Sequence, residues 1–254
     1  MLPNFLHIGA AKCASTWLWR AYQEHPEMCV PTDVGNPSFF LEDYHRGFDW
    51  YKKTYLSHWA GERVLGETSN SYMVSERALE RIARDLSDVK LTMTLRNPVG
   101  RSNVAWVHLH YRRGFGPEQR LAFEDALKPH GWAWFRYWME PSIYAMHLKN
   151  VFRHFSKDRV LVMLYDDLVK NPRDFLRTFL EFLDVDCDFK PTTLDRMVGF
   201  PGDRGADHKG LIEKGMPDGV GEQLQALFRE DIEAVQEITV MTYLIFPTEA
   251  ETIS

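Results

Sequence analysis

Cysteine is scarce in this 254-residue sequence, which has three at unrelated spacings, Cys13, Cys29 and Cys187. An odd number at irregular intervals indicates neither a disulfide framework nor a zinc site. We therefore predict a protein of a reducing compartment that binds no metal.

Long apolar runs are also missing. The opening stretch "MLPNFLHIGAAKCA" has no basic segment ahead of its apolar residues, and Lys12 interrupts it, so it does not resemble a signal peptide. No other stretch approaches the length that a membrane span requires. We expect a cytoplasmic location and no membrane partner.

Positive charge is not in excess. The chain has 30 Lys and Arg against 36 Asp and Glu, a formal net charge of −6 and an isoelectric point of about 5.9. Proteins that coat nucleic acids or anionic membranes need a basic surface. The composition therefore predicts no nucleic-acid partner, although it leaves room for a local basic pocket.

What remains is the composition of one globular domain. Hydrophobic residues make up 44% and charged residues 26% of the chain, and no stretch reads as a linker. We predict a single domain over residues 1–254. Within it, the aromatic-rich stretch 112–141 and the glycine-rich stretch 199–221 are expected to be loops that cover an acceptor or a nucleotide, and 247–254 a tail.

Four short apolar runs predict buried strands, and helical patterns separate or follow them. The expected strands cover residues 4–10, 63–68, 89–96 and 159–165, and the expected helices 15–25, 74–86, 142–155 and 171–185. Continuous apolar strands that alternate with helices are typical of a parallel sheet covered on both faces. The predicted fold is a doubly wound α/β domain.

Ligands of such sheets bind beyond the carboxyl ends of the strands. The residues expected there are Lys12 with its loop, Glu67, Arg96, and the pair Asp166 and Asp167. The aspartates are expected to cap the helix that follows, and Asp167 also to orient Arg96.

The stretch "HIGAAKCASTWLWR" predicts an anion site. A strand, a turn of small residues and a helix opening with Ser15 and Thr16 would gather unpaired backbone N–H groups at one point, with Lys12 beside them. Lys12 precedes Ser15 by three residues, so the stretch is not a Walker A loop, whose lysine directly precedes the Ser or Thr. A plain capped turn with a solvated Lys12 is the alternative.

The stretch "TLRNPVGRSNVAWVHL" predicts a second basic group. Arg96 closes a strand and Arg101 follows five residues later, so two guanidinium groups could converge on a phosphate. Alternatively, Arg96 pairs with a carboxylate such as Asp167, and Arg101 is a surface side chain.

Together these two stretches resemble the sulfotransferases that use 3′-phosphoadenosine 5′-phosphosulfate (PAPS). "IGAAKCASTWL" is similar to their 5′-phosphosulfate loop, G-x-x-K-(S/C)-G-T-(S/T)-x-L, and "LRNPVGRSNVAW" to their 3′-phosphate segment, R-(D/N)-P-x-x-R-x-x-S. "PSIYAMHLKNVF" and "YDDLVKNP" match two further family patterns more loosely. "LGETSNSY" resembles the heparan-sulfate-type and related bacterial enzymes more than the small-phenol cytosolic ones.

The resemblance implies a P-loop-like fold, PAPS as the co-substrate, 3′-phosphoadenosine 5′-phosphate (PAP) as the product, and no metal. It implies that Lys12 stabilises the leaving phosphate and that Glu67 is the general base. Alternatively, Glu67 caps a turn or pairs with Lys12. The implied nucleotide-binding residues are Lys12, Ala14, Ser15, Thr16, Trp17, Arg96, Arg101, Ser102, Lys209 and Gly210.

The sequence departs from the family pattern at two positions. Ala14 replaces the usual loop glycine, which is compatible with a helical or extended backbone but not with a positive φ. Val104 replaces the serine of the 3′-phosphate segment. Either Ser102 or Asn103 substitutes for it, or the 3′-phosphate relies on Arg96, Arg101 and Lys209.

The acceptor is expected to be a small molecule or a carbohydrate. Candidate acceptor-binding residues are His108, Trp132, Trp134 and Tyr137, although aromatic residues this dense are more often core. His108 and His110 would point to different faces of a helix, which disfavours a metal site.

Two other functions fit parts of the pattern: a P-loop kinase or NTPase, and a nucleotide-binding protein without catalytic activity. The oligomeric state does not follow from the sequence.

Overall fold

The fold is described from a computed structural model, for residues 2–112, 139–195 and 219–239. Five strands form one parallel sheet in the order β2-β3-β1-β4-β5. Their bounds are β1 Phe5–Gly9, β2 Met28–Cys29, β3 Val64–Thr68, β4 Lys90–Leu95 and β5 Val160–Leu164. The predicted α/β class and the four predicted strands are confirmed. Strand β2 was not predicted, because two residues are too few to show a hydrophobic pattern in the sequence.

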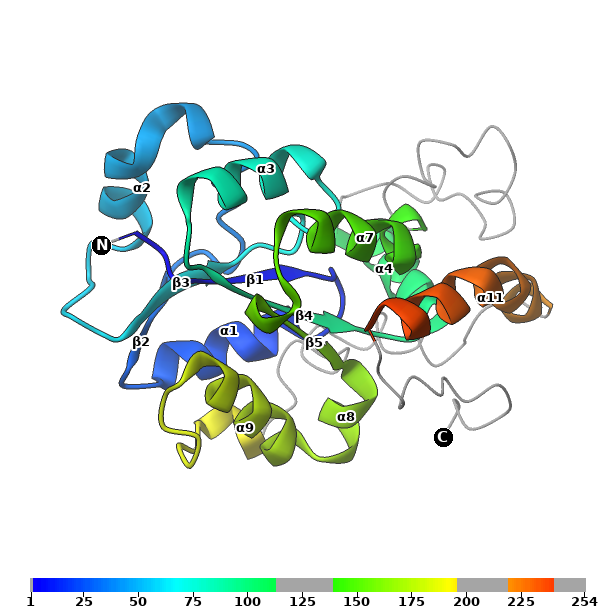
Figure 1. The fold of residues 1–254 in the computed structure, drawn as a ribbon. Coiled ribbons are helices and arrows are strands. Elements are labelled where there is room, and N and C mark those ends of the chain that lie inside the picture. Colours follow the sequence, from blue (N-terminus) through cyan, green and yellow to red (C-terminus); the bar gives the residue numbers. More distant parts are fainter. Residues whose placement is uncertain (1, 113–138, 196–218, 240–254) are drawn as a thin grey trace.

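Helices cover both faces of the sheet, as Figure 1 shows. On one face lie α2 Gly47–Tyr55, α3 Glu76–Asp85 and α7 Tyr144–His154, and on the other α1 Ser15–Glu24, α8 Tyr165–Lys170 and α9 Pro172–Leu183. Beyond the carboxyl ends of the strands lie α4 Pro98–Arg112 and α11 Val220–Thr239, which contact each other. The short 3₁₀ turns are Tyr44–Arg46, Glu140–Ser142, Lys157–Arg159 and Thr192–Asp195.

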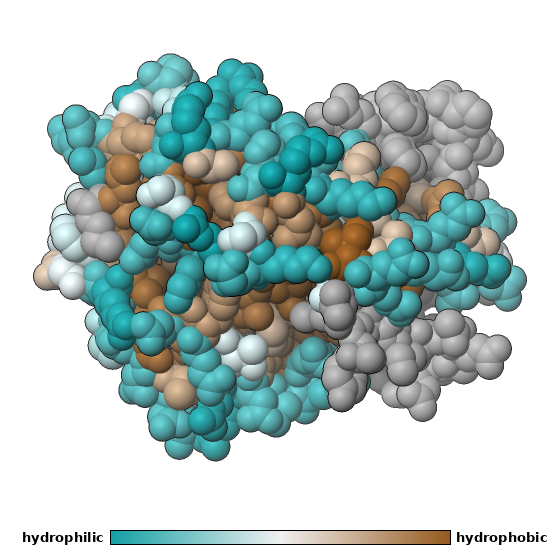
Figure 2. Space-filling model, viewed as in Figure 1, coloured by the Kyte–Doolittle hydropathy of each residue, from teal (hydrophilic) through white to brown (hydrophobic). Residues whose placement is uncertain are grey.

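Strand β1 shows why the apolar runs form a buried sheet. Its five residues are all buried, and successive side chains point to opposite faces. Leu6 and Ile8 pack into a core under α3 and α7, and Phe5 packs into a second core with α1 and α9. Hydrophobic residues lie between the two helical layers and hydrophilic residues over the helices (Figure 2).

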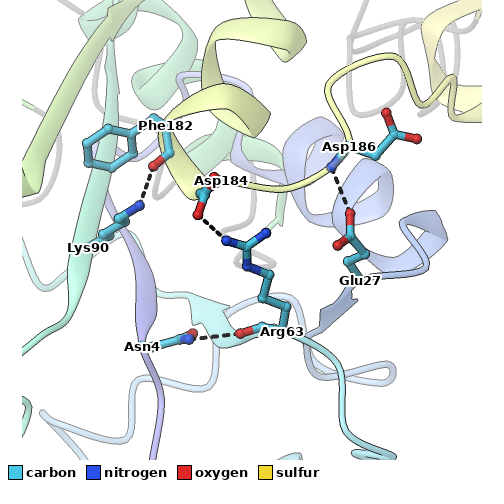
Figure 3. Close-up of polar contacts among 7 residues, drawn as sticks. All are labelled: Asn4, Glu27, Arg63, Lys90, Phe182, Asp184 and Asp186. Atoms are coloured by element: carbon cyan, nitrogen blue, oxygen red, sulfur yellow. Dashed lines mark hydrogen bonds and ion pairs between the residues drawn. The ribbon is translucent and has the colours of Figure 1, made fainter.

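Polar contacts tie the amino end of the sheet to the end of α9 (Figure 3). The Lys90 ammonium donates to the carbonyl of Phe182 at 2.7 Å, and Arg63 forms an ion pair with Asp184. The Asn4 side chain donates to the Arg63 carbonyl at 2.9 Å. These contacts fix the edge of the sheet opposite to the one where β1 leads into α1.

The helix boundaries follow local capping. Ser75 accepts a hydrogen bond from the backbone N–H of Ala78 and starts α3, and Asn171 caps α9 ahead of Pro172 at its first turn. Asp166 and Asp167 lie in the first turn of α8 and do not cap it. There they still interact favourably with the helix dipole.

Gly66 allows β1 and β3 to approach closely. A Cβ atom at this position would lie 2.0 Å from the backbone oxygen of Phe5. We expect Gly66→Ala to lower the free energy of unfolding by about 1–3 kcal/mol or more, because the two strands would have to separate. Urea denaturation measures this.

Gly221→Ala is the matched control for Gly66→Ala. A Cβ atom at Gly221 meets nothing within 4 Å, and alanine favours the helix by about 0.5–1 kcal/mol. Equal stability of the two variants would contradict the close approach of β1 and β3.

Candidate functional site

The loop between β1 and α1 lies at the switch point of the sheet. The strands that follow β1 along the chain extend the sheet in both directions from it, with β3 on one side and β4 on the other. The loop is held against β4 by the backbone N–H of Ala10, which donates to the carbonyl of Thr94 at 3.0 Å. Ligands of open α/β sheets bind at this place.

The first turn of α1 provides the predicted backbone donors. No residue in the described part of the chain accepts a hydrogen bond from the backbone N–H groups of Ser15 and Thr16. Both groups are therefore available to an anion, and the helix dipole adds positive potential. The prediction for Trp17 needs correction, because its N–H donates to the Ala14 carbonyl at 2.9 Å and its ring is fully buried.

The loop backbone adopts a left-handed conformation twice. Lys12 has φ 73° and Ala14 has φ 69°. Alanine at the usual glycine position is therefore strained, since its Cβ disfavours this region. The structure thus shows a positive φ at Ala14, and not the helical or extended backbone that would accommodate alanine without strain.

Arg96 directly follows β4 and is partly exposed beside the β1 loop. Its guanidinium carbon lies 4.3 Å from the centre of the Tyr165 ring, a cation–π arrangement that fixes its direction. Burial raises the pKa of the neighbouring Asp166 carboxyl, and the charge of Arg96 opposes that shift. The carboxylate beside Arg96 is therefore Asp166, whereas the expected Asp167 is exposed.

Arg101 and Ser102 do not lie where the prediction of phosphate contacts requires. The Arg101 side chain is 1% exposed, and its Nε donates to the carbonyl of Ala11 at 3.1 Å. Ser102 is fully buried, with its hydroxyl 3.0 Å from that of Ser142. Helical periodicity turns both side chains inward, where they bond to protein groups.

Glu67 lies at the carboxyl end of β3, as predicted, but points into the core. It is fully buried, and its carboxylate accepts hydrogen bonds from Tyr51 at 2.7 Å, from Ser69 at 2.9 Å and from Tyr72. Burial raises the pKa of this carboxyl, and the three hydroxyl donors partly offset the shift. A general base must come within about 2.6–3.2 Å of its substrate. In this conformation three hydroxyl donors occupy the Glu67 carboxylate, and its role as a general base stays a prediction.

The hydroxyls around Glu67 also hold a neighbouring segment. Ser69 accepts from the backbone N–H of Ser38 at 2.9 Å, and Tyr72 accepts from that of Phe40 at 3.0 Å. The Glu67 carboxylate thus orders the stretch 38–40 against the end of β3. This role of Glu67 is structural, and nothing in the sequence indicated it.

The remaining predicted residues are placed only in part. Lys209, Gly210, Trp132, Trp134 and Tyr137 lie outside the described residues. His108 is half-buried on α4, as are Asn103 and Val104. The described residues contain no group of three or more His, Cys, Asp or Glu side chains placed to hold a metal ion, and no helix among them is long and apolar enough to cross a bilayer.

Three residues of the site were missed. Ser142 bonds to Arg101 at 2.9 Å, Tyr144 donates its hydroxyl to the carbonyl of Arg96 at 2.9 Å, and Asp231 accepts from the start of α7. The stretch "PSIY" was the available signal for the first two. Asp231 lies far along the chain, and its pairing follows from tertiary packing alone.

Replacing Ala14 by glycine should relieve the strained loop. A left-handed backbone costs a non-glycine residue about 1–2 kcal/mol, and the larger chain entropy of glycine offsets about 0.4–1 kcal/mol. We expect Ala14→Gly to raise the free energy of unfolding by up to about 1 kcal/mol in urea denaturation. Ala83→Gly, within α3, is the control and should lower it by about 1 kcal/mol. A loss of stability in both would refute the strain at Ala14.

Replacing Glu67 by glutamine tests its supporting role. The amide nitrogen cannot accept from hydroxyl groups, so we expect Glu67→Gln to lower the free energy of unfolding by about 1–3 kcal/mol. Glu80→Gln, at an exposed position of α3, should stay within about 0.5 kcal/mol of the wild type. Wild-type stability of Glu67→Gln together with lost sulfate transfer would instead restore the general-base role.

Comparison with known proteins agrees with this arrangement. The model of the sulfotransferase domain family matches residues 2–199. The mouse heparan sulfate glucosamine 3-O-sulfotransferase 6 is 28% identical over 240 residues, which cover 89% of this chain and 69% of the relative. The mouse 3-O-sulfotransferase 3B1 is 28% identical over 186 residues, 72% of this chain but only 46% of the relative.

Solved structures share the fold. The crystal structure of a sulfotransferase from Alicyclobacillus acidocaldarius superposes with a TM-score of 0.69 at 24% identity, over 94% of this chain and 96% of that one. The sulfotransferase domain of the Synechococcus PCC 7002 olefin synthase gives a TM-score of 0.54 at 18% identity, over 90% and 94% of the two chains. With a family model that covers most of its length and a β1 loop of the expected form, the chain belongs to the sulfotransferase family.

Proposed function

We propose that this protein transfers a sulfuryl group from PAPS to a hydroxyl of a carbohydrate acceptor. The observation that carries the proposal is that two cationic residues follow neighbouring parallel strands. Lys12 lies in the loop after β1 and Arg96 directly after β4, and the two strands pair with each other. Such a pair suits a nucleotide that carries phosphates at both the 3′ and the 5′ position of its ribose.

The site residues fit the phosphosulfate end of the donor. The N–H groups of Ser15 and Thr16 and the dipole of α1 would bind the 5′-phosphate. Lys12, in the same loop, would place a compact charge near the bridging oxygen. Arg96, held over Tyr165, would bind the 3′-phosphate.

The transfer needs positioning and charge neutralisation more than covalent help from the protein, as in phosphoryl transfer. The acceptor oxygen attacks sulfur, the bond from sulfur to the bridging phosphate oxygen breaks, and the acceptor proton is released. Negative charge grows on the departing phosphate, where Lys12 and the loop amides stabilise it.

The acceptor class is inferred from the relatives and from "LGETSNSY". The curated relatives are named for 3-O-sulfation of a glucosamine in heparan sulfate. A carbohydrate hydroxyl is therefore our proposed acceptor for this chain. A cytoplasmic location stays a prediction.

Sulfate transfer is tested by incubating the protein with PAPS and oligosaccharides and searching by mass spectrometry for a gain of one SO₃. We expect Lys12→Met to lower kcat by roughly 10²-fold or more, because the leaving phosphate loses its cation. Lys53→Met, on the exposed face of α2, should keep wild-type activity. An unchanged rate in Lys12→Met would contradict the leaving-group role.

Two controls separate the other functions. Transfer from PAPS should persist in EDTA, whereas a kinase or NTPase needs Mg²⁺. PAP at a hundred times its Kd should stabilise the protein by about 2.7 kcal/mol whether or not transfer follows. Stabilisation by PAP without transfer to any acceptor would favour a binding protein without catalytic activity.

A further inference from the structure

A buried guanidinium group joins three segments of the site. The Arg101 side chain is 1% exposed. Its Nε donates to the carbonyl of Ala11 at 3.1 Å, and its Nη1 donates to the hydroxyl of Ser142 at 2.9 Å. Ala11 directly precedes Lys12, so this contact reaches the backbone beside the proposed leaving-group cation.

The anchor of Arg101 is itself fixed. The Ser142 hydroxyl lies 3.0 Å from that of Ser102, one residue after Arg101 on α4. Two residues after Ser142, the Tyr144 hydroxyl donates to the carbonyl of Arg96 at 2.9 Å. The short stretch 142–144 therefore contacts the side chain of one arginine and the backbone of the other.

Helix α11 completes the support. The two carboxylate oxygens of Asp231 accept hydrogen bonds from the backbone N–H groups of Tyr144 and Ala145, each at 2.9 Å. These are donors of the first turn of α7, which would otherwise lack partners within that helix. Asp231 thus fixes the start of α7 and, through it, the position of Ser142.

The β1 loop needs such a support. Lys12 and Ala14 both have positive φ, which side chains other than glycine disfavour. A conformation of this kind persists when contacts around it determine it. The hydrogen bond from Arg101 to the Ala11 carbonyl is such a contact from outside the loop.

We propose that Arg101 is a positioning residue that holds the β1 loop, and hence Lys12, in the geometry for sulfuryl transfer, with Ser142 as its anchor. Arg101 does not contact the 3′-phosphate, and within the stretch 96–102 Arg96 alone distinguishes a 3′-phosphorylated nucleotide. This inference rests on the proposed function for its link to transfer. The support of the loop itself is independent of any ligand.

Hydrogen–deuterium exchange of the ligand-free protein tests the support. We expect the amides of residues 10–17 to exchange about tenfold faster in Arg101→Lys and Ser142→Ala, with β4 amides as the internal reference. Ser75→Ala is the matched control, since it removes a serine hydroxyl that accepts a hydrogen bond at the start of α3, away from the loop. Exchange in Ser142→Ala equal to that in Ser75→Ala overturns the inference.

Nucleotide discrimination tests the separation of roles. Calorimetry would compare the Kd values of PAP and of adenosine 5′-monophosphate, which lacks the 3′-phosphate. We expect Arg96→Ala to reduce the preference for PAP by about tenfold or more, and Arg101→Lys and Ser142→Ala to keep it within about twofold. Loss of the preference in Arg101→Lys overturns the positioning role and restores the phosphate contact.

Steady-state kinetics link the support to transfer. Ser142→Ala should lower kcat by about tenfold or more with a nearly unchanged KM for PAPS, because small misplacements of a catalytic group cost rate more than binding. Wild-type kcat in this variant overturns the inference. Should the wild type bind neither nucleotide, the proposed function fails, while the exchange experiment still decides whether Arg101 supports the loop.

Discussion

Strand β1 lies between β3 and β4, and all three strands run in the same direction. This places the loop after β1 beside the residues that follow β3 and β4. Two features of the site follow from that constraint: Ala10 bonds to β4, and Arg96 emerges beside the loop. The N–H groups of the first turn of α1 lie at the same edge, so an anion there would meet both a positive charge and backbone donors.

Two buried polar networks flank this edge. From the sequence we expected the charged residue at the centre of each to meet a ligand or solvent. The carboxylate of Glu67 is enclosed by three hydroxyls, and the guanidinium of Arg101 lies against a carbonyl and a serine. A buried charge is tolerated only with good hydrogen-bond partners, and it then fixes the positions of the segments that carry those partners. The charged residues near the strand ends thus divide into partly exposed groups, Lys12 and Arg96, and buried groups that shape the site.

The fold could be predicted because its signals are local. Continuous apolar runs at residues 4–10 and 89–96 indicate fully buried parallel strands. The observed strands β1 and β4 are shorter than these predicted ranges only by a residue at each end. Helix α9 was predicted from its apolar periodicity and from Pro172 in its first turn. The position of the β1 loop follows from the strand and helix that flank it.

The sequence by itself determined the parallel α/β architecture, the loop around Lys12 and the family. Only the tertiary structure decided which of two arginines is buried, that Glu67 is enclosed, and that Ala14 has a positive φ. The reason is physical: hydrophobic periodicity is a property of neighbouring residues, whereas the burial of a charge depends on partners far along the chain. For Arg101 that partner is Ser142, itself positioned by Asp231 through the start of α7.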